Sequence, residues 1–190
     1  MPYDPHFRAD VPVNVNDNKF TIYPRALNIT WGNDKRYWNL PRRDPKKEEG
    51  FAELKQVCWL EVTGSTEKEV VPGKEYKVGF VVSLRPDAFG WDDCSVYIMA
   101  KIGKKGSFSF KKISLAGKPT DLTKFTIPND DDKLTIKVGN PKEPKPSEND
   151  DLNLYFGLYE VWTNRWKGGL RIHHAFVEGV HSTDKSTQSK

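Results

Sequence analysis

The chain has 190 residues, enough for one sizeable hydrophobic core but few for two domains of usual size. Its 36% hydrophobic content excludes a disordered chain, and its net charge of +4 is scattered among acids rather than gathered into the basic stripe of a dedicated nucleic-acid binder. It shows no secretory signal and no apolar run able to span a bilayer, so we expect a cytoplasmic protein without membrane insertion.

The two ends of the chain differ in composition from the middle. Residues 1–19 are rich in Asp, Asn and Pro and predict a flexible N-terminal segment. Residues 181–190 are almost all small, polar or charged and predict a disordered tail. One domain is therefore expected over residues 20–180.

Segments of strand character alternate with turn sequences along this domain. The strongest signal is at 76–84, where hydrophobic residues recur at every second position, as in a half-buried strand. The predicted strands, in chain order, are 26–31, 54–62, 76–84, 95–102, 107–115, 124–127, 133–138, 152–161 and 170–180. Gly or Pro marks the turns between them, including a surface loop at 141–146. Because no segment keeps a helical apolar stripe for three turns, we predict a single all-β domain, an antiparallel β-sandwich of jelly-roll type.

The chemically reactive residues show no catalytic or metal-binding pattern. His173 and His174 are adjacent on a predicted strand and so point to opposite faces, which does not suit a shared metal ion. Two cysteines, Cys58 and Cys94, do not make a disulfide framework and are expected to be reduced core residues. The acidic run at 130–132 reads as a turn. We therefore predict a protein that is not an enzyme and needs no metal or cofactor.

Two segments concentrate aromatic and polar residues, 27–38 and 159–170. Pyranose rings stack their apolar faces on Trp or Tyr, while their hydroxyl and acetamido groups need a few fixed donors and acceptors. The same rings also suit the closed end of a β-sandwich core. A third aromatic loop, at 87–93 around Trp91, fits either an extension of a sugar site or a plug for the sandwich.

Glu160 falls in phase with the core-facing residues of its predicted strand. A carboxylate in that position is costly unless it has a partner. The candidates are Lys167, Arg165 or a ligand hydroxyl.

Several motifs together resemble the phloem protein 2 family, which includes the tobacco-agglutinin-like lectins. They are the ITW and YW of 26–38, the VCWLE of 53–62, the strand at 76–84 and the WKGGL of 160–179. The resemblance implies a plant lectin of cytosol, nucleus and phloem sap, often dimeric. Such lectins bind oligomers of N-acetylglucosamine, as in chitooligosaccharides and N-glycan cores. One departure is at 129–136, where this chain lacks the tryptophan that family members commonly carry.

The resemblance also implies the site residues. Trp31 and Trp38 match the family's two sugar-binding tryptophans, and Glu160 matches its late-strand glutamate. The same motifs contribute four further predicted site residues, Asn33, Tyr37, Trp166 and Lys167. The alternative is an RNA-binding protein or a structural protein of phloem filaments, roles that the resemblance and the basic charge also allow.

Overall fold

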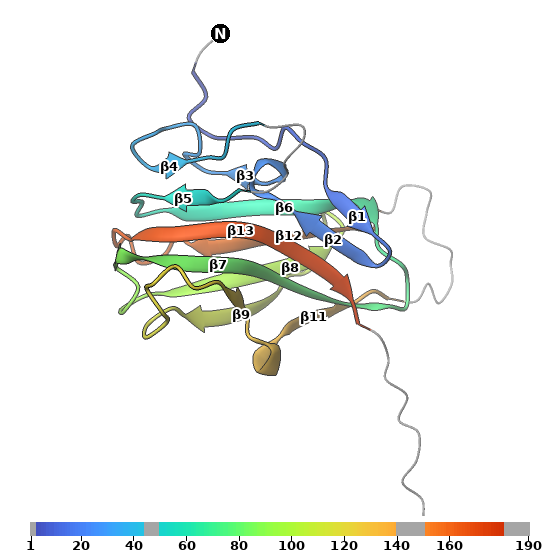
Figure 1. Cartoon of the computed structure of the whole chain (residues 1–190). Helices are drawn as coiled ribbons and strands as arrows, with labels where there is room; N and C mark the ends of the chain where they lie inside the picture. Colours follow the sequence, from blue (N-terminus) through green and yellow to red (C-terminus); the bar gives the residue numbers. More distant parts are fainter. Residues whose placement is uncertain (1–2, 44–49, 140–150, 181–190) are drawn as a thin grey trace, which may run out of the picture.

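The computed structural model describes residues 3–43, 50–139 and 151–180, and it confirms the all-β prediction. Two antiparallel sheets pack face to face as a β-sandwich of jelly-roll type, with the hydrophobic core between them (Figure 1). The predicted loop at 141–146 and the predicted tail at 181–190 lie outside the described residues.

The first sheet is built around its longest pairing, between β13 and β7. Its strands are β1 (Asn14–Asn16), β2 (Lys19–Ile22), β4 (Trp38–Asn39), β5 (Ala52–Leu54), β7 (Glu75–Phe89), β10 (Phe125–Ile127), β11 (Leu134–Lys137) and β13 (Gly168–Gly179). The other edge of β13 pairs with β5 near its start and with β2 near its end. The other edge of β7 pairs with β11 and then β10.

The second sheet has the strand order β3-β6-β12-β8-β9. Its strands are β3 (Asn28–Ile29), β6 (Leu60–Glu69), β8 (Ser95–Ile102), β9 (Ser109–Ser114) and β12 (Asn153–Glu160). Along β6, Leu60 and Val62 are fully buried, while Glu61 and Thr63, which alternate with them, are partly exposed. This alternation gives the second sheet an outward face with polar and aromatic side chains.

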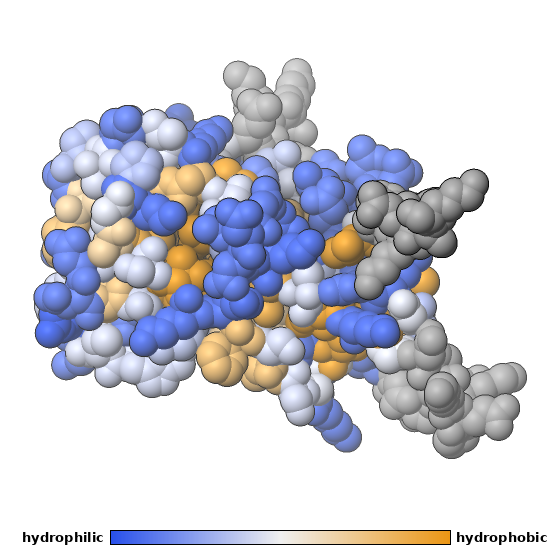
Figure 2. Space-filling model, turned by 90° about the horizontal axis from the view of Figure 1, so that it is seen from below, coloured by the Kyte–Doolittle hydropathy of each residue, from blue (hydrophilic) through white to orange (hydrophobic). Residues whose placement is uncertain are grey.

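Helical structure in the described residues is confined to two short 3₁₀ turns, η1 (Pro24–Ala26) and η2 (Asp130–Asp132). The second one is the predicted acidic turn, and the Asn129 side chain caps it by accepting a hydrogen bond from the Asp132 amide. Within the described part of the chain, no helix has the length and apolar character needed to cross a membrane. The face seen in Figure 2 is mainly hydrophilic, and its hydrophobic residues show in scattered groups.

The seven strands predicted from residue 76 onward are confirmed to within a few residues, except that β7 continues to Phe89. Two earlier strand predictions are corrected. The strand predicted at 26–31 is reduced to the two residues of β3. The strand predicted at 54–62 is in fact the end of β5 and the start of β6, which belong to different sheets. Residues 55–59 carry the chain across from one sheet to the other, so Cys58 lies in a crossover and is only half-buried.

The N-terminal residues were expected to be flexible, but from Phe7 onward the segment contacts the sandwich, and residues 14–16 form β1. Phe7 is 7% exposed and exchanges two backbone hydrogen bonds with Ile29, of 3.0 and 2.9 Å. The guanidinium group of Arg25 lies 5.0 Å from the centre of the Phe7 ring. The polar composition hid this anchoring, because Phe7 is one buried aromatic ring in an otherwise polar segment.

Candidate functional site

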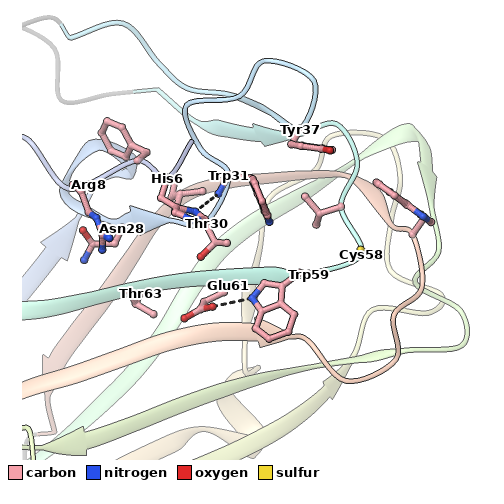
Figure 3. Close-up of a pocket in the computed structure, with 14 residues that line it drawn as sticks. His6, Arg8, Asn28, Thr30, Trp31, Tyr37, Cys58, Trp59, Glu61 and Thr63 are labelled. Carbon is pink, nitrogen blue, oxygen red and sulfur yellow. Dashed lines mark hydrogen bonds between the residues drawn. The ribbon is translucent and has the colours of Figure 1, made fainter. Parts of the chain in front are cut away.

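An open pocket of about 750 Å³ lies where the outward face of β6 meets the loops at one end of the sandwich (Figure 3). The N-terminal segment, the turn after β3, the 55–59 crossover and the loop before β13 all contribute to its lining. Besides the buried Phe7, its large rings are Trp31, Tyr37, Trp59 and Trp166.

Four rings form a continuous row along one side of the pocket. The centroid of Trp31 lies 5.0 Å from that of His6 and 5.9 Å from that of Tyr37. Tyr37 in turn stacks on Trp166 at 6.4 Å. Trp31 is 37% exposed and Trp166 is 52% exposed, so both still offer ring surface to a ligand. Several exposed tryptophan surfaces gathered around one space are typical of a surface that binds a partner.

The backbone turn after β3 sets the direction of the Trp31 ring. Trp31 has a φ of 63°, in the left-handed region that non-glycine residues seldom adopt. Its amide donates to Nδ1 of His6 at 3.1 Å, and the amide of Gly32 donates to the Ile29 carbonyl at 2.9 Å. The N-terminal segment therefore takes part in fixing this ring.

Trp59 projects into the same space from the start of β6 (Figure 3). It is 46% exposed, and its indole N–H donates to the carboxylate of Glu61 at 2.8 Å. This hydrogen bond fixes the ring and leaves other lone pairs of the carboxylate available for a hydroxyl group. The pocket thus combines open ring faces with oriented acceptors.

Glu160 and Lys167 are brought together, but in the interior. Glu160 is 1% exposed and forms an ion pair with Lys167, whose side chain is fully buried. The ammonium group also donates to the Cys58 carbonyl at 3.1 Å, and the Thr163 amide and hydroxyl donate to Glu160 at 3.1 and 2.9 Å. Burial raises the pKa of Glu160, but the hydrogen bonds from Lys167 and Thr163 outweigh it and hold that pKa below its ordinary value. The pair therefore supports the loops that line the pocket, and neither of its side chains lines the pocket itself.

Two other predicted site residues also lie away from the pocket. Trp38, in β4, is 1% exposed and packs in the core, so it presents no open ring face to a ligand in this structure. Asn33 is exposed, but its side-chain amide donates to the carbonyls of Asp4 and His6, at 3.1 and 2.8 Å. Its role here is to tie down the N-terminal segment.

The burial of Trp91 decides between the two roles predicted for its loop. Trp91 is 4% exposed, and its indole N–H donates to the Gly168 carbonyl at 2.9 Å. The ring therefore packs in the hydrophobic core of the sandwich and does not extend the pocket. Cys94 lies buried nearby, and burial raises the pKa of its thiol.

Three of the seven predicted site residues, Trp31, Tyr37 and Trp166, line the pocket. Trp59, Glu61 and His6 also line it and were not predicted. The signal for Trp59 was present, because it alternates with buried Leu60 at the start of β6. Across the described ranges, no group of three His, Cys, Asp or Glu residues is close enough to hold a metal ion.

A β-sandwich with an open, tryptophan-lined pocket of this kind defines a binding domain. The chain belongs to the phloem protein 2 family, since the family model described as Phloem protein 2 matches residues 17–178. It is 43% identical to the protein PHLOEM PROTEIN 2-LIKE A9 of Arabidopsis thaliana over 182 residues, which cover 92% of this chain and 96% of that protein. The resemblance seen in the sequence motifs is thereby confirmed.

Two further relatives match less of their own length. A protein of Luffa acutangula described as a lectin is 40% identical over 117 residues, covering 59% of this chain and 54% of that one. The protein PHLOEM PROTEIN 2-LIKE A1 of Arabidopsis thaliana is 30% identical over 161 residues, covering 83% of this chain and 60% of that protein. Among solved structures, the CBM22-1 xylan-binding domain of Paenibacillus barcinonensis Xyn10C has a TM-score of 0.41 at 8% identity over 94% of both chains, a likeness too distant to carry an argument.

Proposed function

We propose that this protein is a lectin that binds oligomers of N-acetylglucosamine in the pocket and does not make or break bonds. The observation that carries the proposal is the placing of three partly exposed tryptophans, Trp31, Trp59 and Trp166, around one open space. The likeness to a Luffa acutangula protein described as a lectin supports it.

Apart from His6 and Arg8 of the N-terminal segment, the polar groups of the pocket suit an uncharged polyhydroxyl ligand. Glu61 supplies an acceptor already oriented by Trp59, and Thr63 and Asn28 supply small neutral groups next to it. Acetamido methyl groups and the apolar faces of sugar rings match the tryptophan surfaces. An open pocket of this kind binds single sugars weakly, with a Kd of about 1 mM, and gains affinity through longer oligomers.

The test is calorimetric titration with tri-N-acetylchitotriose at low and high salt. The wild-type protein should bind with an affinity that hardly depends on salt, whereas contacts with RNA phosphates would weaken steeply as salt rises. Trp31→Ala and Trp166→Ala should each reduce the affinity about tenfold or more, since each removes one ring contact.

A matched control exists in Trp162. It is 58% exposed and packs on Tyr97, 4.8 Å away between ring centroids, outside the lining of the pocket. Trp162→Ala should therefore leave the affinity within about twofold of the wild type. A folded wild-type protein that gives no binding heat with the trisaccharide at either salt concentration would overturn the proposal.

We also propose that the protein works in the cytoplasm as a homodimer, a state that the family resemblance favours. Light scattering of the purified protein would measure the mass in solution, for comparison with the 21.8 kDa of one chain. A mass of one chain at all concentrations would contradict the dimer. Fluorescent tagging in plant cells would test the compartment.

A further inference from the structure

A second, smaller hollow of about 270 Å³ adjoins the pocket on the outward face of the second sheet. Both hollows are lined by Asn28 and Thr63, so they share a rim. Figure 3 shows these two residues at the end of the pocket far from Trp59. From Glu61 in the pocket to Ser65 in the second hollow, β6 advances about 13 Å, which is more than one sugar ring.

The N-terminal segment forms one wall along both hollows. His6 and Arg8 line the pocket, and Ala9 lines the second hollow. The amide of Ala9 donates to the side-chain oxygen of Asn28 at 3.0 Å, which holds the segment beside the shared rim. The two hollows therefore share a wall and a rim, and we call them together the groove.

Aromatic rings form the far part of the groove. Phe108 is 46% exposed, and the ammonium group of Lys101 lies 4.6 Å from its ring centre. The Tyr159 ring lies against the backbone of Gly157, where an added Cβ would approach the ring to 2.6 Å. Tyr155 also lines this hollow and is fixed by a 2.7 Å hydrogen bond from its hydroxyl to Asp151. These rings offer apolar surface on which a sugar ring can stack, as the tryptophans do in the pocket.

The polar groups of the second hollow are neutral hydroxyls with one carboxylate beside them. Among the described residues, the hydroxyls of Thr63, Ser65 and Tyr159 make no hydrogen bond within 3.5 Å, so they are available to a ligand. The carboxylate is that of Glu67, which accepts from the Val13 amide at 3.1 Å. Free hydroxyls next to acidic groups favour a neutral polyhydroxyl chain over a phosphate backbone.

We infer that the second hollow is a further sugar subsite, and that the groove along β6 binds a continuous oligosaccharide rather than one terminal sugar. The inference rests on the proposed function, because the second hollow would hold further sugars of the same oligosaccharide that the pocket binds. The pocket holds one end of the oligosaccharide against the tryptophans. Phe108, Ser65 and Tyr159 contact the sugars that follow.

The test is calorimetric titration with the dimer, trimer, tetramer and hexamer of β-1,4-linked N-acetylglucosamine. The wild-type affinity should rise about tenfold from the dimer to the hexamer. Phe108→Ala removes a ring of the second hollow, and Ser65→Tyr fills it from an outward strand position. Both should lower the hexamer affinity about fivefold and leave the dimer affinity within about twofold.

Phe110→Ala is the matched control. Phe110 is 57% exposed on β9, packs near Tyr97, and lines neither hollow. This substitution should change neither affinity. Equal wild-type affinity for all four oligomers, or a hexamer affinity that neither Phe108→Ala nor Ser65→Tyr lowers, would overturn the second subsite and leave the proposed function standing. Failure of every oligomer to bind the folded protein would overturn both.

Discussion

The ammonium group of Lys167 lies between the carboxylate of Glu160 and the carbonyl oxygen of Cys58, and the side chains of Glu160 and Lys167 are both buried behind the pocket. This single side chain links the end of β12, the start of β13 and the crossover between β5 and β6. Trp166 precedes Lys167 and Trp59 follows Cys58. Val57 and Lys167 also exchange two backbone hydrogen bonds of 2.9 Å, so the buried ion pair reinforces a backbone pairing that joins the two sides of the pocket.

Breaking the pair should destabilise the fold. Lys167→Met leaves the Glu160 carboxylate buried without its counter-charge, which costs about 3 kcal/mol in the free energy of unfolding. Urea denaturation followed by tryptophan fluorescence measures this change. A cost below about 1 kcal/mol would show that the buried pair does not hold the loops.

The double variant Glu160→Gln with Lys167→Met is the control, because it removes both charges together. Its stability should return to within about 1 kcal/mol of the wild type, since a buried ion pair is commonly replaced at little cost by neutral groups of similar volume. Equal destabilisation of the single and double variants would mean that packing, rather than charge, explains the effect.

Trp38 should act on stability rather than on sugar contact. Trp38→Ala creates a cavity in the core and should cost about 4 kcal/mol in the free energy of unfolding. Trp38→Phe keeps most of the ring, and it removes a buried indole N–H that has no partner. Calorimetric titration of Trp38→Phe with tri-N-acetylchitotriose should therefore give nearly the wild-type affinity. A folded Trp38→Phe protein that no longer binds would place Trp38 in the sugar site.

The sequence predicted the sandwich well where strands are long and alternate regularly, as from residue 76 onward. The strand prediction was wrong where only two residues of a strand pair with their neighbour. Trp38 belongs to a two-residue strand opposite Leu54, and no periodicity can show which face such a strand buries. The 55–59 crossover looked like strand because it continues the apolar alternation of the strands on either side.

The candidate site was only partly predictable, because some of its contacts join residues that are far apart in the sequence. Trp31 and Trp166 were named from the family resemblance, and both lie in the segments that concentrate aromatic and polar residues. His6 was missed because its contact with Trp31 joins segments 25 residues apart, through one hydrogen bond. Glu160 was correctly expected to need a partner, and Lys167 was among the named candidates, but spacing alone cannot show whether a ligand also reaches the pair.

Asn33 should influence binding without touching the ligand. Asn33→Ala removes two hydrogen bonds to the N-terminal segment, worth about 1 kcal/mol each. Because His6 in that segment fixes the Trp31 backbone, the affinity for tri-N-acetylchitotriose should fall about threefold. Limited proteolysis should also cut the segment faster. Unchanged binding and unchanged proteolysis would show that the other contacts of the segment, including those of Phe7 and Ala9, anchor it without the Asn33 side chain.

The stability of the protein should fall as the pH drops through the range in which His173 titrates. Burial, together with the positive charges of Lys124, His174 and Arg171, lowers the pKa of His173 from 6.5 to about 4. Between these values the unfolded chain binds a proton that the folded protein excludes, so the free energy of unfolding decreases from pH 6.5 toward pH 4. His173→Gln keeps a partner for the Ser83 hydroxyl, which lies 2.9 Å from the imidazole Nε2, and it removes the titration. Thermal unfolding at both ends of this window should show a smaller loss of Tm in the variant than in the wild type, and an equal loss in both would mean that other groups govern the acid response.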